Sequence, residues 1–115
     1  MTDTVLRSGR LMDGNCTFEF ERWLARRNGV DYAVTCHSGT QALEIIAEFW
    51  HQELYSTCTR PKPVVVVPAM TYPATLNAFA RTGWQLIIAD TDRYGQLDIN
   101  RIPDESVDML CAVGL

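Results

Sequence analysis

The chain has 115 residues and a mass of 13.0 kDa, which is enough for one domain with a modest core. Hydrophobic residues make up 47% and charged residues 21% of the sequence, a composition that is typical of globular proteins and argues against intrinsic disorder. The net charge of −4 and the scattered arginines argue against nucleic acid as a partner, and no apolar run approaches the length that spans a membrane.

The N-terminus has no apolar core, so it does not resemble a signal peptide. The cysteines show no C-x-x-C spacing, and neither histidine is paired with them in a zinc-binding pattern. We therefore expect a cytoplasmic protein with reduced thiols and no metal site. The cysteines are Cys16, Cys36, Cys58 and Cys111, and we expect Cys36 and Cys111 to lie on buried strands.

Residues 1–16 are polar and predict an extended N-terminal arm or loop, followed by an incomplete α/β domain over residues 17–115. The first helix of that domain begins near Thr17, because aromatic and aliphatic side chains recur from there at helical spacing. Asn28-Gly29 ends it. Its apolar face consists of Phe20, Trp23 and Leu24.

Tyr32 to Cys36 predicts the first strand, and the second helix runs from about Gly39 to Leu54. An apolar stripe along this helix predicts core packing. The stripe consists of Leu43, Ile46, Ala47, Trp50 and Leu54. The segment from Ser56 to Pro63 contains two prolines and predicts a loop.

Val64 to Val67 are four β-branched residues without alternation, which indicates a strand buried on both faces of a parallel sheet. A short helix follows from Pro73 or Ala74 to Arg81, and Gly83 lies just past its end. Trp84 to Ala89 is again largely apolar and predicts the third strand.

Asp90-Thr91-Asp92 begins a turn, Asp98 to Ile102 predicts one helical turn, and Met109 to Val113 predicts a fourth strand. Strands that alternate with helices at this spacing predict an α/β fold with a mostly parallel sheet and right-handed crossovers. The sequence ends directly after a buried strand, so we expect the chain to be the front part of a larger domain.

The string Ser38-Gly39-Thr40 lies at the junction of the first predicted strand and the second helix. The first amides of a helix lack partners, and glycine lets an anion approach the backbone, so this junction has the properties of a phosphate site. A capping box formed by Ser38 and Gln41 explains the same residues without a ligand.

Ligands of open parallel sheets collect outside the carboxyl ends of the strands. Three loops leave the predicted strands there, and they carry Ser38–Thr40, Met70–Tyr72 and Asp90–Asp92. A helix start that holds phosphate beside the Tyr72 ring suits a planar phosphorylated cofactor, because the aromatic ring can stack on it.

These motifs together resemble the DegT/DnrJ/EryC1/StrS family of pyridoxal-phosphate-dependent sugar aminotransferases. The order and spacing agree from roughly Arg7 to the last residue. The matching strings are Phe20-Glu21, Tyr32-Ala33-Val34, Ser38 to Leu43, Val66 to Ala78, Gly83 and Asp90-Thr91-Asp92.

The resemblance implies the N-terminal part of the large domain of a fold-type-I, aspartate-aminotransferase-like enzyme. It implies pyridoxal 5′-phosphate as cofactor, with Ser38, Gly39 and Thr40 at its phosphate and Tyr72 on its pyridine ring. It also implies a homodimer that transfers an amino group from a donor such as glutamate to a keto-sugar nucleotide. For Thr75 and Asn77 we expect packing and capping, and for Asp90 and Asp92 solvated carboxylates at a loop.

The family's chemistry needs a lysine that bonds covalently to the cofactor and an aspartate that keeps the pyridine nitrogen protonated, so that the ring can act as an electron sink. Both lie downstream of the matched region, so this chain has no assigned catalytic residue. The only lysine is Lys62, which lies between two prolines before a strand. We do not expect it to be the cofactor lysine, and we expect the 115 residues alone to be inactive in transamination.

Two other hypotheses remain open. In the first, the chain is a truncated or split module that binds the cofactor or dimerises without catalysis. In the split version, a second chain carries the lysine segment. In the other, Asp90-Thr91-Asp92 is the Asp-x-Asp motif of a nucleotide-sugar glycosyltransferase that binds a divalent cation. This last reading leaves Ser38–Thr40 and Tyr72 unexplained.

Overall fold

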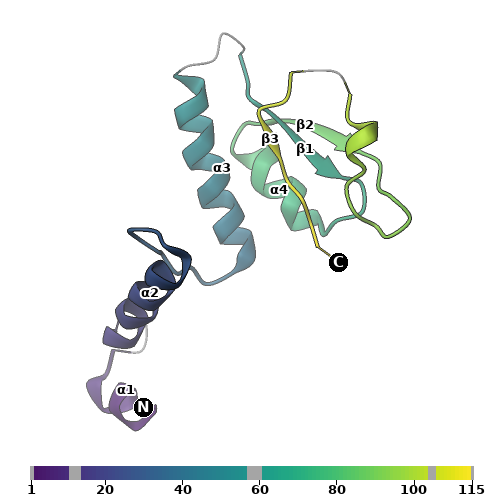
Figure 1. Cartoon of the computed structure of the whole chain (residues 1–115). Coiled ribbons are helices and arrows are strands. Elements are labelled where there is room, and N and C mark those ends of the chain that lie inside the picture. Colours follow the sequence, from purple (N-terminus) through teal and green to yellow (C-terminus); the bar gives the residue numbers. More distant parts are fainter. Residues whose placement is uncertain (1, 11–13, 57–60, 104–105, 115) are drawn as a thin grey trace. The chain divides into compact units, whose positions relative to one another are not determined.

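The computed structural model describes residues 2–10, 14–56, 61–103 and 106–114 (Figure 1). The chain forms two compact units, unit 1 over Met1–His37 and unit 2 over Ser38–Leu115. The boundary between an arm over residues 1–16 and a domain over residues 17–115 remains a prediction. The loop residues 57–60, Cys58 among them, lie outside the described residues.

Unit 1 begins with a short helix, α1 (Thr2–Ser8), so the prediction of an extended arm is wrong for these residues. Local pairs stabilise this helix, since Arg7 pairs with Asp3 one turn earlier at 2.9 Å and the Ser8 hydroxyl donates to the Val5 carbonyl. The helix buries none of its residues. Because α1 buries no apolar face, its sequence carries no apolar stripe that would predict a helix.

The second helix, α2 (Asn15–Asn28), begins two residues before the predicted start and ends at the predicted Asn28-Gly29. Gly29 has a φ of 66°, and the Val30 amide donates to the Ala25 carbonyl at 3.1 Å, which together form a glycine-terminated helix end. Phe20 and Trp23 are about half exposed, and their rings stack at a centroid distance of 5.9 Å.

Residues 32–36 form no strand, so the predicted first strand is wrong. A strand is stable only when its backbone pairs with a neighbour, and the Thr35 amide donates instead to the Glu21 carboxylate of α2. Cys36 is exposed rather than buried on a strand. Tyr32 and Val34 are more than four-fifths exposed.

Unit 2 contains a parallel sheet, as predicted, in the order β2-β1-β3. Its strands are β1 (Val64–Pro68), β2 (Gln85–Ala89) and β3 (Met109–Leu110). The central strand β1 is buried along its whole length, which confirms the prediction of a buried strand over Val64 to Val67. β3 corresponds to the predicted fourth strand over Met109 to Val113 but is shorter, and Cys111 follows it and is only partly buried.

The helices α3 (Gly39–Tyr55) and α4 (Pro73–Arg81) pack against each other, and their bounds agree closely with the prediction. The core joins Ala47 of α3 and Phe79 of α4 to Val65 and Val67 of β1. Trp84 completes this core. Its ring packs edge-on against the Phe79 ring, with the ring centroids 5.7 Å apart, and its Nε1–H donates to the Ala47 carbonyl at 2.9 Å.

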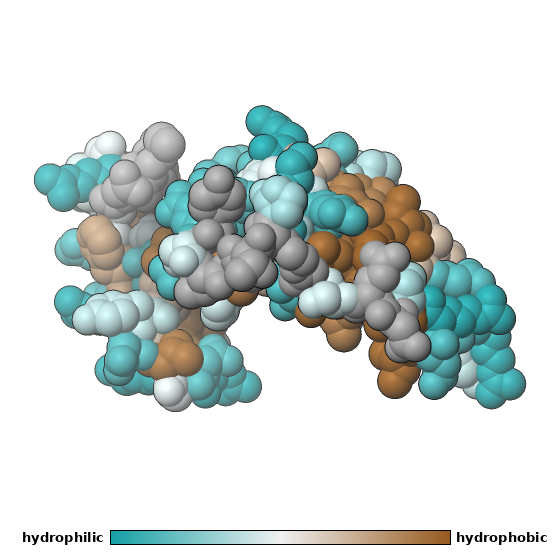
Figure 2. Space-filling view, turned by 90° about the horizontal axis from the view of Figure 1, so that it is seen from above, coloured by the Kyte–Doolittle hydropathy of each residue, from teal (hydrophilic) through white to brown (hydrophobic). Residues whose placement is uncertain are grey.

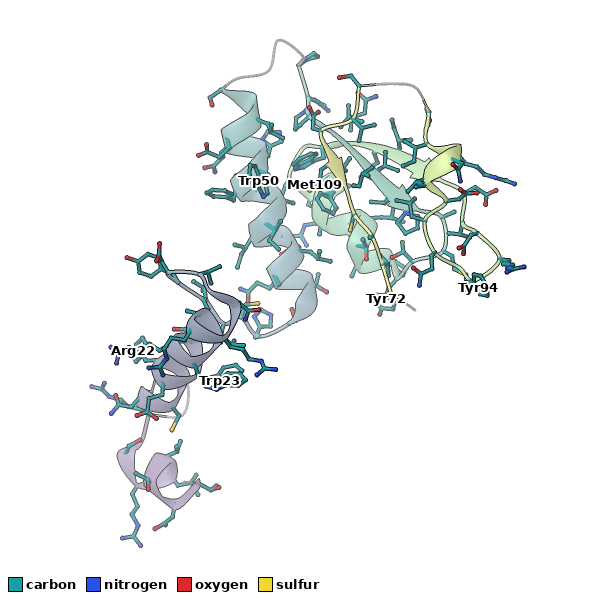
Figure 3. The ribbon with its side chains drawn as sticks, viewed as in Figure 1. Arg22, Trp23, Trp50, Tyr72, Tyr94 and Met109 are labelled. Carbon is teal, nitrogen blue, oxygen red and sulfur yellow. The ribbon has the colours of Figure 1, made fainter. Side chains whose placement is uncertain are left out.

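Only part of the predicted α3 stripe lies in the core. Ala47 is fully buried and Leu54 packs against the cluster, whereas Ile46 and Trp50 are nearly half exposed. Figure 3 labels Trp50 on this helix. Figure 2, which colours residues by hydropathy, shows hydrophobic residues in brown at the surface of the viewed face. The helix thus presents more apolar surface than this sheet covers.

The segment after β2 turns back on itself through an isolated antiparallel bridge between Thr91 and Leu97. A 3-10 helix, η1 (Ile99–Arg101), follows, and Asp98 caps it by accepting the Asn100 amide at 3.0 Å. The predicted turn and helical turn are both confirmed. Among the described residues, no helix combines the length and the apolar character that a bilayer-crossing helix needs.

Replacement of Trp84 by Phe tests the core hydrogen bond, because it removes the Nε1–H that donates to the Ala47 carbonyl in a buried site, while that mid-helix carbonyl keeps its intrahelical partner. We expect Trp84→Phe to lower the free energy of unfolding by about 1 kcal/mol from the lost hydrogen bond. Trp50→Phe is the matched control, because Trp50 is 46% exposed. Urea denaturation measures both, and equal losses in the two variants would contradict the assigned role of the Trp84 hydrogen bond.

Candidate functional site

The start of α3 is the first part of the candidate site. Ser38 is extended, with φ −155° and ψ 157°, and its hydroxyl oxygen accepts the Gln41 amide at 3.2 Å. The first intrahelical bond runs from the Ala42 amide to the Ser38 carbonyl at 3.1 Å. Ser38 is therefore a helix cap, and the amides of Gly39 and Thr40 precede the first bond of the helix.

The surroundings of these amides suit an anion. Gly39 and Thr40 are exposed, and a Cβ placed on Gly39 would meet no atom within 4 Å. A phosphate oxygen can thus approach the backbone, and the dipole of a 17-residue helix favours a negative charge there. These residues fit the phosphate group of the implied cofactor. The predicted strand-to-helix junction is instead a junction between an extended segment and a helix.

Tyr72 is the second part of the candidate site, and Figure 3 labels it at the amino-terminal end of α4. Its side chain is 78% exposed and makes no capping hydrogen bond, so its ring presents a surface on which a planar ligand can stack. Its carbonyl accepts the Thr75 amide at 2.9 Å.

Thr75 fixes the turn that carries Tyr72. It is buried, and its hydroxyl lies 3.1 Å from the hydroxyl of Thr71. Thr75 is therefore packed as expected, and its hydroxyl accepts from Thr71 and does not cap the helix, whereas Asn77 is exposed on the helix. The Ala69 amide donates to the Ala89 carbonyl at 2.8 Å, which ties the loop after β1 to the end of β2.

The start of α3 and Tyr72 both belong to unit 2, and each lies at the amino end of a helix. The loop that carries Tyr72 leaves the carboxyl end of β1, as the sheet topology predicts. That one cofactor contacts Ser38, Gly39, Thr40 and Tyr72 together remains a prediction.

The carboxylates of the Asp-x-Asp string serve the local structure. Asp90 pairs with the Arg101 guanidinium, and Asp92 accepts the amides of Tyr94 and Gln96 at 2.8 and 2.9 Å. These contacts account for both side chains without a bound cation. Among the residues that the structure describes, no group of three or more His, Cys, Asp or Glu side chains is placed to hold a metal ion.

Lys62 is exposed and precedes β1 at its amino end. Tyr72 and Asp90, by contrast, follow the carboxyl ends of β1 and β2. The position of Lys62 thus supports the prediction that it does not bond to a cofactor held beside Tyr72.

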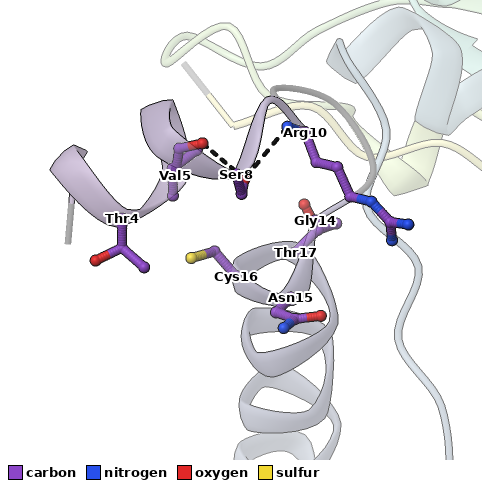
Figure 4. A pocket seen from close by; sticks show the side chains of 8 residues that line it. All are labelled: Thr4, Val5, Ser8, Arg10, Gly14, Asn15, Cys16 and Thr17. Carbon is purple, nitrogen blue, oxygen red and sulfur yellow. Dashed lines mark hydrogen bonds between the residues drawn. The ribbon is translucent and has the colours of Figure 1, made fainter.

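A separate cavity of about 380 Å³ lies in unit 1, between α1 and the first turn of α2. Figure 4 shows its lining, which includes Ser8, Arg10 and Cys16. None of the predicted cofactor-binding residues lines it. Among the residues that the structure describes, Cys16, Cys36 and Cys111 are not part of a disulfide bond.

Glu21 is a residue whose contacts the sequence did not predict. One of its carboxylate oxygens accepts both the amide and the hydroxyl of Thr35, each at 2.8 Å. These two hydrogen bonds, first that from the amide, lower the pKa of Glu21 below its ordinary value of 4.5. The pair at positions 21 and 35 carries no local pattern that would have revealed it.

The lowered pKa of Glu21 predicts a stability that depends on pH. The ionised carboxylate is favoured in the folded state, so its contribution is fully present above pH 4.5 and is lost as the pH falls through the lower folded value. We expect wild type to exceed Glu21→Gln in free energy of unfolding at pH 7, and the difference to shrink below pH 4.5. A difference that stays constant from pH 7 to pH 3 would contradict this.

The cap at Ser38 also has a direct test. We expect Ser38→Ala to lower the free energy of unfolding by about 1 kcal/mol, because the Gln41 amide loses its acceptor, and Ser38→Asn to retain most of it. Thermal and urea denaturation measure both variants without any ligand. No loss in Ser38→Ala would show that the cap does not stabilise α3.

Comparison with known proteins gives consistent results. GDP-perosamine synthase of Escherichia coli O157:H7 is 37% identical over 79 residues, which cover 69% of this chain and 20% of that protein. UDP-2-acetamido-2-deoxy-3-oxo-D-glucuronate aminotransferase of Pseudomonas aeruginosa is 32% identical over 88 residues, which cover 76% of this chain and 23% of that protein.

Two solved structures share the fold. Helicobacter pylori PseC, an aminotransferase involved in the biosynthesis of pseudoaminic acid, superposes with a TM-score of 0.74 at 21% identity, over 95% of this chain and 29% of PseC. Spr1654 of Streptococcus pneumoniae, assigned as a sugar aminotransferase and solved in its PMP form, has a TM-score of 0.65 at 30% identity, over 85% of this chain and 23% of Spr1654.

The chain spans about a fifth of the length of the two relatives that it matches in sequence. The model of the DegT/DnrJ/EryC1/StrS aminotransferase family matches residues 1–105, which is most of the chain. The α/β architecture, the motif spacing and this match agree, and the chain belongs to the DegT/DnrJ/EryC1/StrS aminotransferase family.

Proposed function

We propose that this chain forms the N-terminal part of a pyridoxal-phosphate-dependent aminotransferase that acts on a keto-sugar nucleotide, with an amino-acid donor such as glutamate. Family membership supports the reaction class, and the names of the relatives support a nucleotide-sugar substrate. The observation that carries the proposal is the open amino end of α3, where Gly39 leaves room for an anion.

Each candidate residue has a physical role in this proposal. The amides of Gly39 and Thr40 donate to the cofactor phosphate, and the Thr40 hydroxyl adds a third donor. Ser38 holds the first helical turn through its cap. The ring of Tyr72 stacks on the pyridine ring and restricts its tilt. When bound, pyridoxal phosphate supplies an electron sink for the bonds at the reacting carbon.

The lysine that bonds to the cofactor is, in our proposal, a residue other than Lys62. The relatives are about five times longer than the matched segment, so they have room for a lysine segment beyond the part that this chain matches. We assign that lysine to a further segment of the native gene product or to a second chain. A homodimer in the cytoplasm is the assembly and location that we propose for the complete enzyme.

Two substitutions test the cofactor site in the native gene product. We expect Tyr72→Ala to weaken pyridoxal-phosphate binding roughly threefold to tenfold through loss of stacking, and Thr40→Ala to weaken it by a similar factor through loss of a hydroxyl donor to a charged group. Absorbance titration of the bound cofactor measures the dissociation constants.

Tyr94→Ala is the matched control, since Tyr94 is also an exposed aromatic residue on a loop after a strand. It should leave the dissociation constant unchanged. Unchanged binding in Tyr72→Ala and Thr40→Ala would contradict the assigned site. Binding without transamination from glutamate to any keto-sugar nucleotide tested would favour a non-catalytic module.

A further inference from the structure

Tyr72 has an exposed ring, so the backbone that carries it decides where the ring lies. The side chain is 78% exposed, and packing against neighbouring residues therefore contributes little to its position. A ring that must first be ordered by a ligand costs free energy on binding, whereas a ring on a fixed backbone costs less. The contacts of the loop between β1 and α4 thus bear on the strength of stacking.

Backbone hydrogen bonds hold this loop at both ends. At its start, the Ala69 amide donates to the Ala89 carbonyl of β2 at 2.8 Å, and at its end the Tyr72 carbonyl accepts the Thr75 amide at 2.9 Å. Pro73 follows Tyr72 and restricts the backbone before it to extended conformations, in agreement with φ −71° and ψ 138° at Tyr72. Two residues separate Ala69 from Tyr72.

A bond between two side chains closes this short loop. The Thr71 hydroxyl donates to the Thr75 hydroxyl at 3.1 Å. Thr75 is 6% exposed and lies in the first turn of α4, so the surrounding residues hold its side chain in place. Thr75 therefore binds the chain on both sides of the Tyr72 side chain. Its hydroxyl holds the residue before Tyr72, and its amide holds the Tyr72 carbonyl.

We propose that Thr71 and Thr75 are positioning residues for the Tyr72 ring, acting through the bond between their hydroxyls. This inference rests on the proposed function, because it requires that Tyr72 stacks on the cofactor. Every contact that carries it lies within unit 2. Neither threonine has an assigned contact with the cofactor, and both act through Tyr72.

Valine and serine substitutions separate the hydroxyl from the rest of the side chain. Valine keeps the shape of threonine and lacks the hydroxyl, whereas serine keeps the hydroxyl. Thr75→Val should therefore release the loop, and Thr75→Ser should behave like wild type. Thr71→Val removes the same bond from its donor, which is only partly buried, and it replaces Thr75→Val in the test if that variant does not fold.

The test is a double-mutant cycle on the native gene product, with pyridoxal 5′-phosphate as the probe and absorbance titration as the measurement. We expect Thr75→Val to raise the dissociation constant roughly threefold, and by no more than Tyr72→Ala does, because the lost stacking sets the limit. In a chain that already carries Tyr72→Ala, Thr75→Val should have no further effect. A general structural defect would instead weaken binding equally in both backgrounds.

Thr82→Val is the matched control. Thr82 follows the last residue of α4, at the end of the helix away from Tyr72, and its hydroxyl donates to the Ala78 and Phe79 carbonyls at 2.9 and 3.1 Å. This variant also removes a threonine hydroxyl from α4 and should leave the dissociation constant unchanged. A rise equal to that in Thr75→Val would show that lost stability of α4, rather than lost positioning, weakens binding.

The outcomes separate this inference from the proposed function. If Tyr72→Ala leaves cofactor binding unchanged, the proposed stacking site is wrong. If Tyr72→Ala weakens binding and Thr75→Val does not, or if Thr75→Val weakens it equally with and without the Tyr72 ring, the threonines are not positioning residues and the proposed function stands. A loss in Thr75→Val that disappears in the Tyr72→Ala background, with retention in Thr75→Ser, supports the inference.

Discussion

The burial of β1 is the constraint on which unit 2 depends. Val65, Val66 and Val67 have no exposed surface, and a strand buried in this way must have its backbone paired and both of its faces covered. Pairing with β2 and β3 satisfies the backbone, and α3 and α4 cover the face of Val65 and Val67. These contacts direct the loop after β1 to the side where Tyr72 lies.

The features that the sequence predicted correctly have local causes. Four consecutive β-branched apolar residues favour a strand, and because they place apolar side chains on both of its faces, they also predict that both faces are buried. Pro73 at the start of α4 and Gly83 after its end mark that helix by backbone preferences alone. The bounds of α3 follow from the Ser38 cap and from the helical spacing of its side chains.

The features that the sequence did not predict depend on residues far apart in the chain. Residues 32–36 have the composition of a strand, but a strand also needs a neighbour, and here the Thr35 amide binds Glu21 instead. The exposure of Ile46 and Trp50 likewise depends on what covers α3. The cap and the exposed Tyr72 of the candidate site were predictable, whereas the Glu21 contact was not.

The cap and the proposed phosphate site at α3 are compatible, because the Ser38 hydroxyl accepts the Gln41 amide and leaves the earlier amides available to a ligand. A crystal structure of the native gene product with bound pyridoxal 5′-phosphate tests this most directly. We expect the phosphate oxygens to lie within hydrogen-bond distance of the Gly39 and Thr40 amides and the pyridine ring to lie against Tyr72. A phosphate held elsewhere, with the start of α3 facing only solvent, would show that these residues do not form the cofactor site.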